Sequence, residues 1–263
     1  MTTQDLGIGV TVGYDDVGSD NGHGDAIILF HGLQGGRRML DRFAAELSTS
    51  LRVLNVDQRD SGETTNPADP YDVATLADDA AALLAELDIE RTHLFGTSFG
   101  GRVAQAFALR HPHLVDRLVL MATWPMPDSL LDVNPAGLAR LLDIQSRMPA
   151  SANELAEFFV PAAHLEAHPD TRAEMLSMSG DPERAARRTA AAGTHHGAAS
   201  DISARTLVVA GSEDPLIPPD VGRHLATLIA HAEVEVLDGI GHSGTQQDPA
   251  LVARLVTDFV GAA

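Results

Sequence analysis

The stretch Gly96–Gly101, with the sequence Gly-Thr-Ser-Phe-Gly-Gly, constrains this chain most, because it lies between an apolar run and a helical one. A strand that turns sharply into a helix strains its central residue, and only small neighbours leave room for that conformation. Gly96 and Gly100 supply this room around Ser98. The Ser98 hydroxyl is then expected at a helix N-terminus, where free N–H groups favour developing negative charge. The pattern predicts a nucleophile on a strand-to-helix turn.

Two later segments supply a candidate acid and base. The apolar run 207–211 ends in a polar turn with Asp214, and the alternating run 234–238 leads to a glycine-flanked loop with His242. A serine hydroxyl needs a base of pKa about 6.5 to take its proton, and a carboxylate must hold that imidazole. We predict that His242 is the base and Asp214 its partner, because Asp214 lies just past a strand end, where loops gather at the edge of an α/β sheet. Three other carboxylates are rivals: Glu213, Asp238 and Asp248.

A third segment predicts an oxyanion hole. The apolar run 27–30 is followed by a glycine-rich loop at residues 31–36, in which backbone N–H groups can be exposed. The expected donors are the N–H groups of Leu33 and Phe99, each stabilising a transition state by roughly 3 kcal/mol. His31 is expected to be structural, with its ring bonded to the backbone of this loop.

In order and spacing, His31-Gly32, the Gly96–Gly101 motif, Asp214 and Gly241-His242 resemble the α/β-hydrolase family over nearly the whole chain. Residues 57–62 and 70–71, with a helix expected over 76–87, are similar to its serine carboxylesterase, lactonase and methyl-esterase branch. The resemblance implies an α/β fold with a mostly parallel central sheet flanked by helices and a helical cap inserted after the sixth strand. It also implies that no cofactor is used. Ser98 argues against the members of this fold that carry an aspartate nucleophile.

Two departures from the family pattern bear on the substrate. Glu63 stands where relatives often carry Arg or Leu, and residues 244–249 replace the more usual acidic tail after the histidine. Neither departure touches the residues that define serine chemistry.

The alternation of apolar runs and amphipathic stretches predicts a parallel sheet covered by helices. Strands are expected near 8–12, 26–30, 52–56, 93–95 and 118–121, and helices over 38–47, 75–87 and 100–110. Residues 7–17 and 18–22 suggest a leading antiparallel hairpin strand. From 124 to 200 the strand signal stops and prolines punctuate short helical stretches. We therefore expect a core domain of residues 1–123 and 201–263 with a cap at 124–200.

The cap carries aromatic and methionine side chains that could line an apolar pocket. These are Trp124, Met126, Met148, Phe158, Phe159, Met175 and Met178, and the residues expected to touch substrate are Trp124, Met126, Phe158 and Met175. Four histidines also lie in this segment: His164, His168, His195 and His196. No metal is expected there, because their spacing matches no known site and serine chemistry needs none.

Composition excludes several classes of function. The 263 residues carry a net charge of −19, which repels phosphate backbones and anionic membranes, so no nucleic-acid or membrane partner is expected. The chain has no cysteine, which excludes disulfides, thiolate metal sites and a cysteine nucleophile. It also has no uninterrupted apolar run of about 18 residues, the length expected of a membrane span. Its first residues lack a signal sequence, which predicts a cytoplasmic location. The sequence allows a homodimer. Arg37, Arg38 and Arg59 are candidates for binding a substrate carboxylate or carbonyl, or else are solvated or paired.

Together these features predict a serine hydrolase that cleaves a neutral, largely apolar ester or lactone through an acyl-enzyme on Ser98. Two alternatives remain open. The same residues could serve a thioesterase, perhydrolase, C–C hydrolase or lyase, since motifs alone do not separate these from esterases. A receptor that uses the pocket mainly to hold a ligand is the other alternative.

Overall fold

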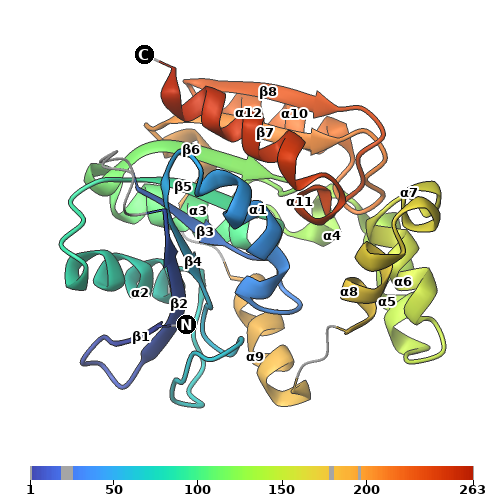
Figure 1. Ribbon diagram of the computed structural model, residues 1–263, viewed down its shortest axis with the longest axis horizontal. Coiled ribbons are helices and arrows are strands. Elements are labelled where there is room, and N and C mark those ends of the chain that lie inside the picture. Colours follow the sequence, from blue (N-terminus) through green and yellow to red (C-terminus); the bar gives the residue numbers. More distant parts are fainter. Residues whose placement is uncertain (1, 19–25, 178–180, 195–196, 263) are drawn as a thin grey trace.

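The computed structural model describes residues 2–18, 26–177, 181–194 and 197–262. These residues form an eight-stranded sheet with the strand order β1-β2-β4-β3-β5-β6-β7-β8, shown in Figure 1. The strands are β1 (Thr2–Asp5), β2 (Thr11–Val17), β3 (Ala26–Phe30), β4 (Arg52–Val56), β5 (Thr92–Thr97), β6 (Val115–Met121), β7 (Arg205–Gly211) and β8 (Ala232–Leu237). The pairings of β1 with β2 and of β2 with β4 are antiparallel, and the others are parallel. The mostly parallel sheet predicted from the sequence is confirmed.

Helices cover both faces of the sheet, so its central strands are buried along almost their whole length. In β3 all five residues are buried. Ile27 and Leu29 pack into one apolar cluster, with α1 (Asp41–Leu47) and α12 (Pro249–Gly261). Ile28 and Phe30 point the other way, into a cluster with α2 (Val73–Glu86), α3 (Phe99–Arg110) and α10 (Pro219–Leu228). This alternation follows from the two-residue period of a strand.

Six helices lie between β6 and β7, within the described part of residues 124–200, the cap segment. They are α4 (Leu130–Val133), α5 (Pro135–Ser146), α6 (Ala152–Phe159), α7 (Ala162–Ala167), α8 (Pro169–Ser177) and α9 (Pro182–Ala192). Figure 1 shows α5 to α8 grouped in a lobe beside the sheet, with α9 apart from them. The shorter elements elsewhere are η2 (Arg37–Leu40), η3 (Pro112–Leu114), η4 (Ala199–Asp201) and α11 (Gly244–Gln247).

The expected strand at 8–12 is wrong in its bounds. Gly7 and Gly9 both have positive φ, of 70° and 77°, so the chain turns there, and the side chain of Ile8 is 59% exposed. The antiparallel hairpin is formed by β1 and β2 around this turn. Residues 19–22 of the second expected turn lie outside the described residues. The expected helix over 38–47 begins as the 3-10 turn η2 and continues as α1.

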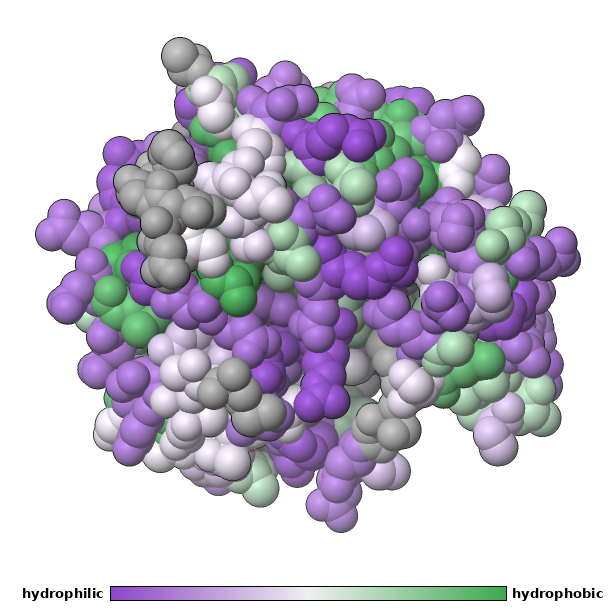
Figure 2. All heavy atoms as spheres, viewed as in Figure 1, coloured by the Kyte–Doolittle hydropathy of each residue, from purple (hydrophilic) through white to green (hydrophobic). Residues whose placement is uncertain are grey.

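The surface is largely polar, in keeping with the high charge. On the face in Figure 2, hydrophobic residues occur in small separate groups among hydrophilic ones. Within the described ranges, no helix is both long and apolar enough to cross a membrane.

Candidate active site

Ser98 occupies the turn between β5 and α3 in a conformation that side chains rarely adopt, with φ 53° and ψ −120°. Small neighbours make this possible. A Cβ on Gly96 would collide with the carbonyl oxygen of Gly100, and a Cβ on Gly100 would collide with that of Phe30. The turn is held by Thr123, whose hydroxyl donates to the Ser98 carbonyl oxygen at 2.8 Å. The backbone therefore fixes the direction in which the Ser98 side chain leaves the turn.

The structure brings Ser98, His242 and Asp214 together from three separate loops. His242 Nε2 lies 3.0 Å from Ser98 Oγ, and His242 Nδ1 lies 2.8 Å from Asp214 Oδ2. The other oxygen of Asp214 accepts the N–H groups of Leu216 at 2.8 Å and Ile217 at 2.9 Å. Asp214 and His242 are 4% and 6% exposed, respectively. A buried carboxylate with these donors orients the imidazole toward the serine.

The rival acids make their contacts elsewhere. Glu213 and Asp238 are exposed, and the hydroxyl of Ser212 donates to Asp238 at 3.4 Å. Asp248 accepts the N–H of Leu251 at 2.9 Å and caps α12. Asp214 is therefore the carboxylate that the fold places on His242.

The loop after β3 lies beside the nucleophile. A Cβ added to Gly32 would lie 3.8 Å from the Cβ of Ser98. Within the described part of the chain, the N–H groups of Leu33 and Phe99 have no hydrogen-bond acceptor. Phe99 begins α3, so its N–H has no partner within the helix. Both groups are available to a developing oxyanion, which is the role predicted for them.

His31 is fully buried beneath this loop. Its Nδ1 lies 2.8 Å from the Gly32 carbonyl oxygen and its Nε2 lies 3.0 Å from Ser61 Oγ. Burial, reinforced by the charge of Arg188, holds the pKa of His31 well below its usual range. The ring is therefore neutral, and because Nδ1 faces a carbonyl oxygen, Nδ1 carries the proton.

Of the adjacent phenylalanines at the end of α6, Phe159 rather than Phe158 faces the base. The Phe159 ring centroid lies 5.3 Å from that of His242. The N–H of Ser243 also donates to the Phe159 carbonyl oxygen at 3.0 Å. The cap segment thus contacts the loop that carries His242 through both a ring and the backbone.

The four expected pocket residues are buried in apolar clusters. Trp124 and Phe158 share a cluster with Ile144, Leu216 and Ile217, next to Asp214. Met126 belongs to the large cluster on the α2 and α3 face. Met175 packs in a small cluster within the cap segment. Their contact with a substrate remains a prediction, and Met178 lies outside the described residues.

The candidate arginines differ in their freedom to bind a substrate. Arg37 is buried and pairs with Asp15, Asp57 and Glu63. Arg59 is held by Asp79, with one contact at 2.6 Å. The side chain of Arg38 is 78% exposed. The first two are committed to carboxylates within the protein.

Sequence reasoning missed Arg188, on α9. Its side chain is 2% exposed and reaches the glycine-rich loop. It lies in the run Arg-Ala-Ala-Arg-Arg at 184–188, which has the composition of a solvated helix face. The sequence does carry one signal for this role. Arg184 lies three and four residues before Arg187 and Arg188, and residues at these spacings share one side of a helix.

No group of three or more histidine, cysteine or acidic side chains suited to a metal occurs among the residues that the structure describes. The rings of His164 and His168 stack, with centroids 4.0 Å apart. His195 and His196 lie outside the described residues.

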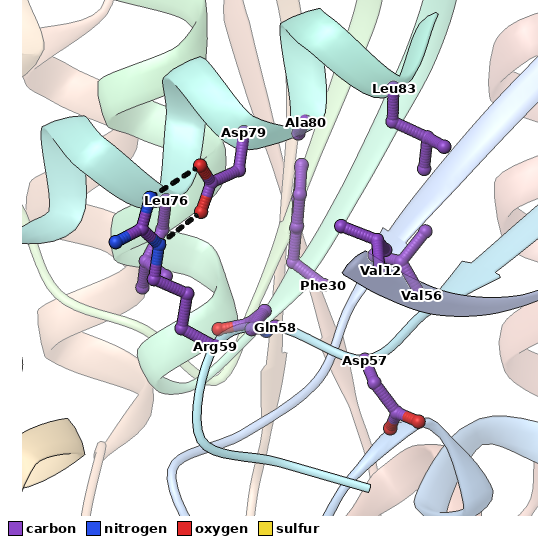
Figure 3. Close-up of a pocket in the computed structure, with 10 residues that line it drawn as sticks. All are labelled: Val12, Phe30, Val56, Asp57, Gln58, Arg59, Leu76, Asp79, Ala80 and Leu83. Carbon is purple, nitrogen blue, oxygen red and sulfur yellow. Dashed lines mark hydrogen bonds and ion pairs between the residues drawn. The ribbon is translucent and has the colours of Figure 1, made fainter. Parts of the chain in front are cut away.

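A small cavity lies away from the nucleophile, between α2 and strands of the sheet. Figure 3 shows its lining, with the ion pair of Arg59 and Asp79 on one side and Val12 and Val56 on the other. Its volume is about 20 Å³, enough for a single water molecule. It is too small for an organic substrate.

A parallel sheet with a serine on the strand-to-helix turn and a histidine and aspartate on two later loops defines a hydrolase of the α/β class. The sequence model described as "alpha/beta hydrolase fold" matches residues 25–248. The chain belongs to this family, as its motifs led us to expect.

Comparisons show which members are similar. The chain is 33% identical over 258 residues to the 2-hydroxymuconate semialdehyde hydrolase of Pseudomonas sp. (strain CF600), covering 93% of this chain and 89% of the relative. The enol-lactonase of Burkholderia xenovorans LB400 has a TM-score of 0.81 at 25% identity, covering 97% and 98% of the two chains. The meta-cleavage product hydrolase CumD of Pseudomonas fluorescens IP01 has a TM-score of 0.78 at 27% identity, covering 95% and 94%.

Proposed function

We propose that this hydrolase cleaves a neutral, largely apolar carboxylic ester or lactone through an acyl-enzyme on Ser98. The observation that carries this proposal is the chain of contacts from Ser98 Oγ through His242 to Asp214, at 3.0 and 2.8 Å. The similarity to an enol-lactonase and to a thermophilic esterase from Thermogutta terrifontis supports the bond type.

In this mechanism, Ser98 Oγ attacks the carbonyl carbon while His242 Nε2 takes its proton. The negative charge that forms on the carbonyl oxygen is met by the N–H groups of Leu33 and Phe99. His242 then gives its proton to the leaving alkoxide, and the same base activates the water that releases the acid. Asp214 holds the ring and stabilises its charged form throughout.

Two observations on charge support a neutral substrate, although the buried guanidinium of Arg188 also lies against the loop after β3. Arg37 and Arg59 are neutralised by internal carboxylates, and the net charge of −19 repels anions. The ring of Phe159 presents an apolar surface next to His242.

Hydrolysis of a carbon–carbon bond is the second candidate, and the identity of 33% to a 2-hydroxymuconate semialdehyde hydrolase favours it. Ser98 would then add to a ketone, and the leaving group would be a stabilised carbanion that takes the proton from His242. An ester releases an alkoxide instead. The two reactions therefore share the attacking group and differ in the bond that breaks.

Labelling by a fluorophosphonate, read by intact mass, tests the nucleophile. One adduct on the wild type and none on Ser98→Ala is expected, whereas an unlabelled wild type would contradict the proposal. Turnover of p-nitrophenyl butyrate, a γ-lactone and an aryl β-diketone then separates the bond types. Cleavage of the diketone alone would replace ester hydrolysis by carbon–carbon hydrolysis.

A further inference from the structure

Helix α9 places a cation against the backbone of the predicted oxyanion hole. Arg188 Nη2 donates to the Gly32 carbonyl oxygen at 2.9 Å, and Arg188 Nε donates to the Leu33 carbonyl oxygen at 2.8 Å. A third donor, Nη1, reaches the Arg59 carbonyl oxygen at 3.1 Å. These acceptors are backbone groups of two loops, whereas the neighbouring Arg187 pairs with the carboxylate of Asp60 at 2.6 Å.

The hydrogen bond to the Gly32 carbonyl oxygen fixes the direction of the Leu33 N–H, which is one of the two predicted oxyanion donors. The Gly32 carbonyl and the Leu33 N–H belong to one peptide unit, which is trans, so they point in opposite directions. A donor that holds the carbonyl also holds the N–H. The second bond, to the Leu33 carbonyl, fixes the next peptide unit in the same way. Both peptide units that flank Leu33 are therefore oriented by one guanidinium.

The same guanidinium contacts the other half of the oxyanion hole. Its carbon lies 5.4 Å from the centroid of the Phe99 ring, a cation–π distance. Phe99 supplies the second N–H, and Gly32 lies beside Ser98. Burial lowers the pKa of Arg188 to about 10, so the side chain remains charged at neutral pH.

We propose that Arg188 is a positioning residue of the oxyanion hole, through which α9 of the cap segment holds the Leu33 N–H toward the reacting carbonyl oxygen. The inference rests on the proposed function. His31 Nδ1 donates to the same Gly32 carbonyl oxygen, so two donors from different parts of the chain hold this peptide unit. Arg188 touches no reacting atom and acts only through this backbone.

The test compares Arg188→Gln with Arg187→Gln, which removes an equal charge from the next position of the same helix. Turnover of p-nitrophenyl butyrate is measured together with inhibition by trifluoroacetophenone. Ser98 Oγ adds to this ketone, its proton passes to His242, and the carbonyl oxygen becomes an oxyanion in the hole. Acetophenone has the same ring but does not form a stable adduct, so it reports ordinary binding.

Removing an oxyanion donor outright lowers kcat about 100-fold to 1000-fold, so misplacing one is expected to lower it by roughly 10-fold to 100-fold. The inhibition constant of trifluoroacetophenone should rise by the same factor in Arg188→Gln, with KM and acetophenone binding unchanged. Arg187→Gln should leave all four values near those of the wild type. A rise in KM alone, or a loss of kcat without weaker ketone inhibition, overturns the proposal.

Arg188→Lys keeps the charge and reaches one carbonyl at a time, so an intermediate loss in both kcat and ketone inhibition is expected. This variant decides the matter if Arg188→Gln does not fold. A Lys variant with a lower melting temperature but unchanged ketone inhibition would show that Arg188 only docks α9. If the wild type neither turns over substrate nor accepts the fluorophosphonate, the proposed function fails instead.

Discussion

The ring of Phe159 lies over the imidazole of His242, with centroids 5.3 Å apart and planes at 34°. The two residues come from α6 and from the loop after β8, which are more than 80 positions apart in the sequence. The cap segment therefore forms part of the wall around the base.

Replacing Phe159 by Ala should lower kcat for p-nitrophenyl butyrate by roughly fivefold, since an aromatic pair contributes about 1 kcal/mol. Without the ring, the imidazole samples other orientations. Steady-state kinetics measures this, and Phe159→Leu should recover part of the loss by restoring bulk. Phe107→Ala is the matched control, because Phe107 is buried near the C-terminal end of α3, away from the Ser98 end of that helix, and should affect mainly the melting temperature. Unchanged kcat in Phe159→Ala would show that the ring plays no part in positioning.

Replacing Asp214 by Asn should lower kcat by about 10⁴, because the amide no longer stabilises the charged imidazole and favours the wrong tautomer. The amide oxygen can still accept the N–H groups of Leu216 and Ile217, so the fold should persist in circular dichroism. Asp238→Asn removes an exposed carboxylate and should leave kcat nearly unchanged. A loss below tenfold in Asp214→Asn would return the rival acids to consideration.

Replacing Ser98 by Gly should give a more stable protein than replacing it by Ala, by about 1 kcal/mol in the free energy of unfolding. Both changes remove the hydroxyl, but glycine alone is relaxed at a φ of 53°. Urea denaturation of the two inactive variants measures the difference. Equal stabilities would mean that Ser98 stores no strain.

The free energy of unfolding should decrease as the pH falls below about 6.5, in part through His31. Burial lowers the pKa of His31 in the folded protein, so below the ordinary value the unfolded chain takes up a proton that the folded protein refuses. This contribution reaches at most about 1.4 kcal/mol per pH unit. His31→Asn should flatten the dependence between pH 6.5 and pH 5 in urea titrations. A variant with the same slope as the wild type would assign the dependence to other groups.

The residues around the nucleophile could be predicted because local backbone requirements mark them in the sequence. Ser98 needs small neighbours, and the loops with Asp214 and His242 follow recognisable apolar strands. Parallel strands end at one edge of a sheet, which brings these loops together without further information. The correct strand bounds near the N-terminus depended instead on two glycines with positive φ around Ile8, whose apolar side chain had suggested a strand.

Arg188 and the orientation of Phe159 could not be predicted in this way. The contact of Arg188 with Gly32 spans 156 positions and depends on how α9 docks. Phe158 and Phe159 are identical in chemistry and adjacent in sequence, so only the rotation of α6 decides which one reaches His242. Both are properties of packing between elements: the spacing of the arginines indicates a shared side of the helix, but not what that side contacts.

His242, the predicted base, follows β8, which is an edge strand of the sheet. Among the described residues, β8 pairs only with β7, and its residues Glu233, Val234 and Glu235 are exposed. An edge strand with little buried surface opens at lower free energy than the strands inside the sheet. Gentle heating should therefore part His242 from Ser98 while most of the secondary structure persists. We therefore expect activity to be lost on heating before the far-ultraviolet circular dichroism signal, because the strand that precedes the base lies at an edge of the sheet.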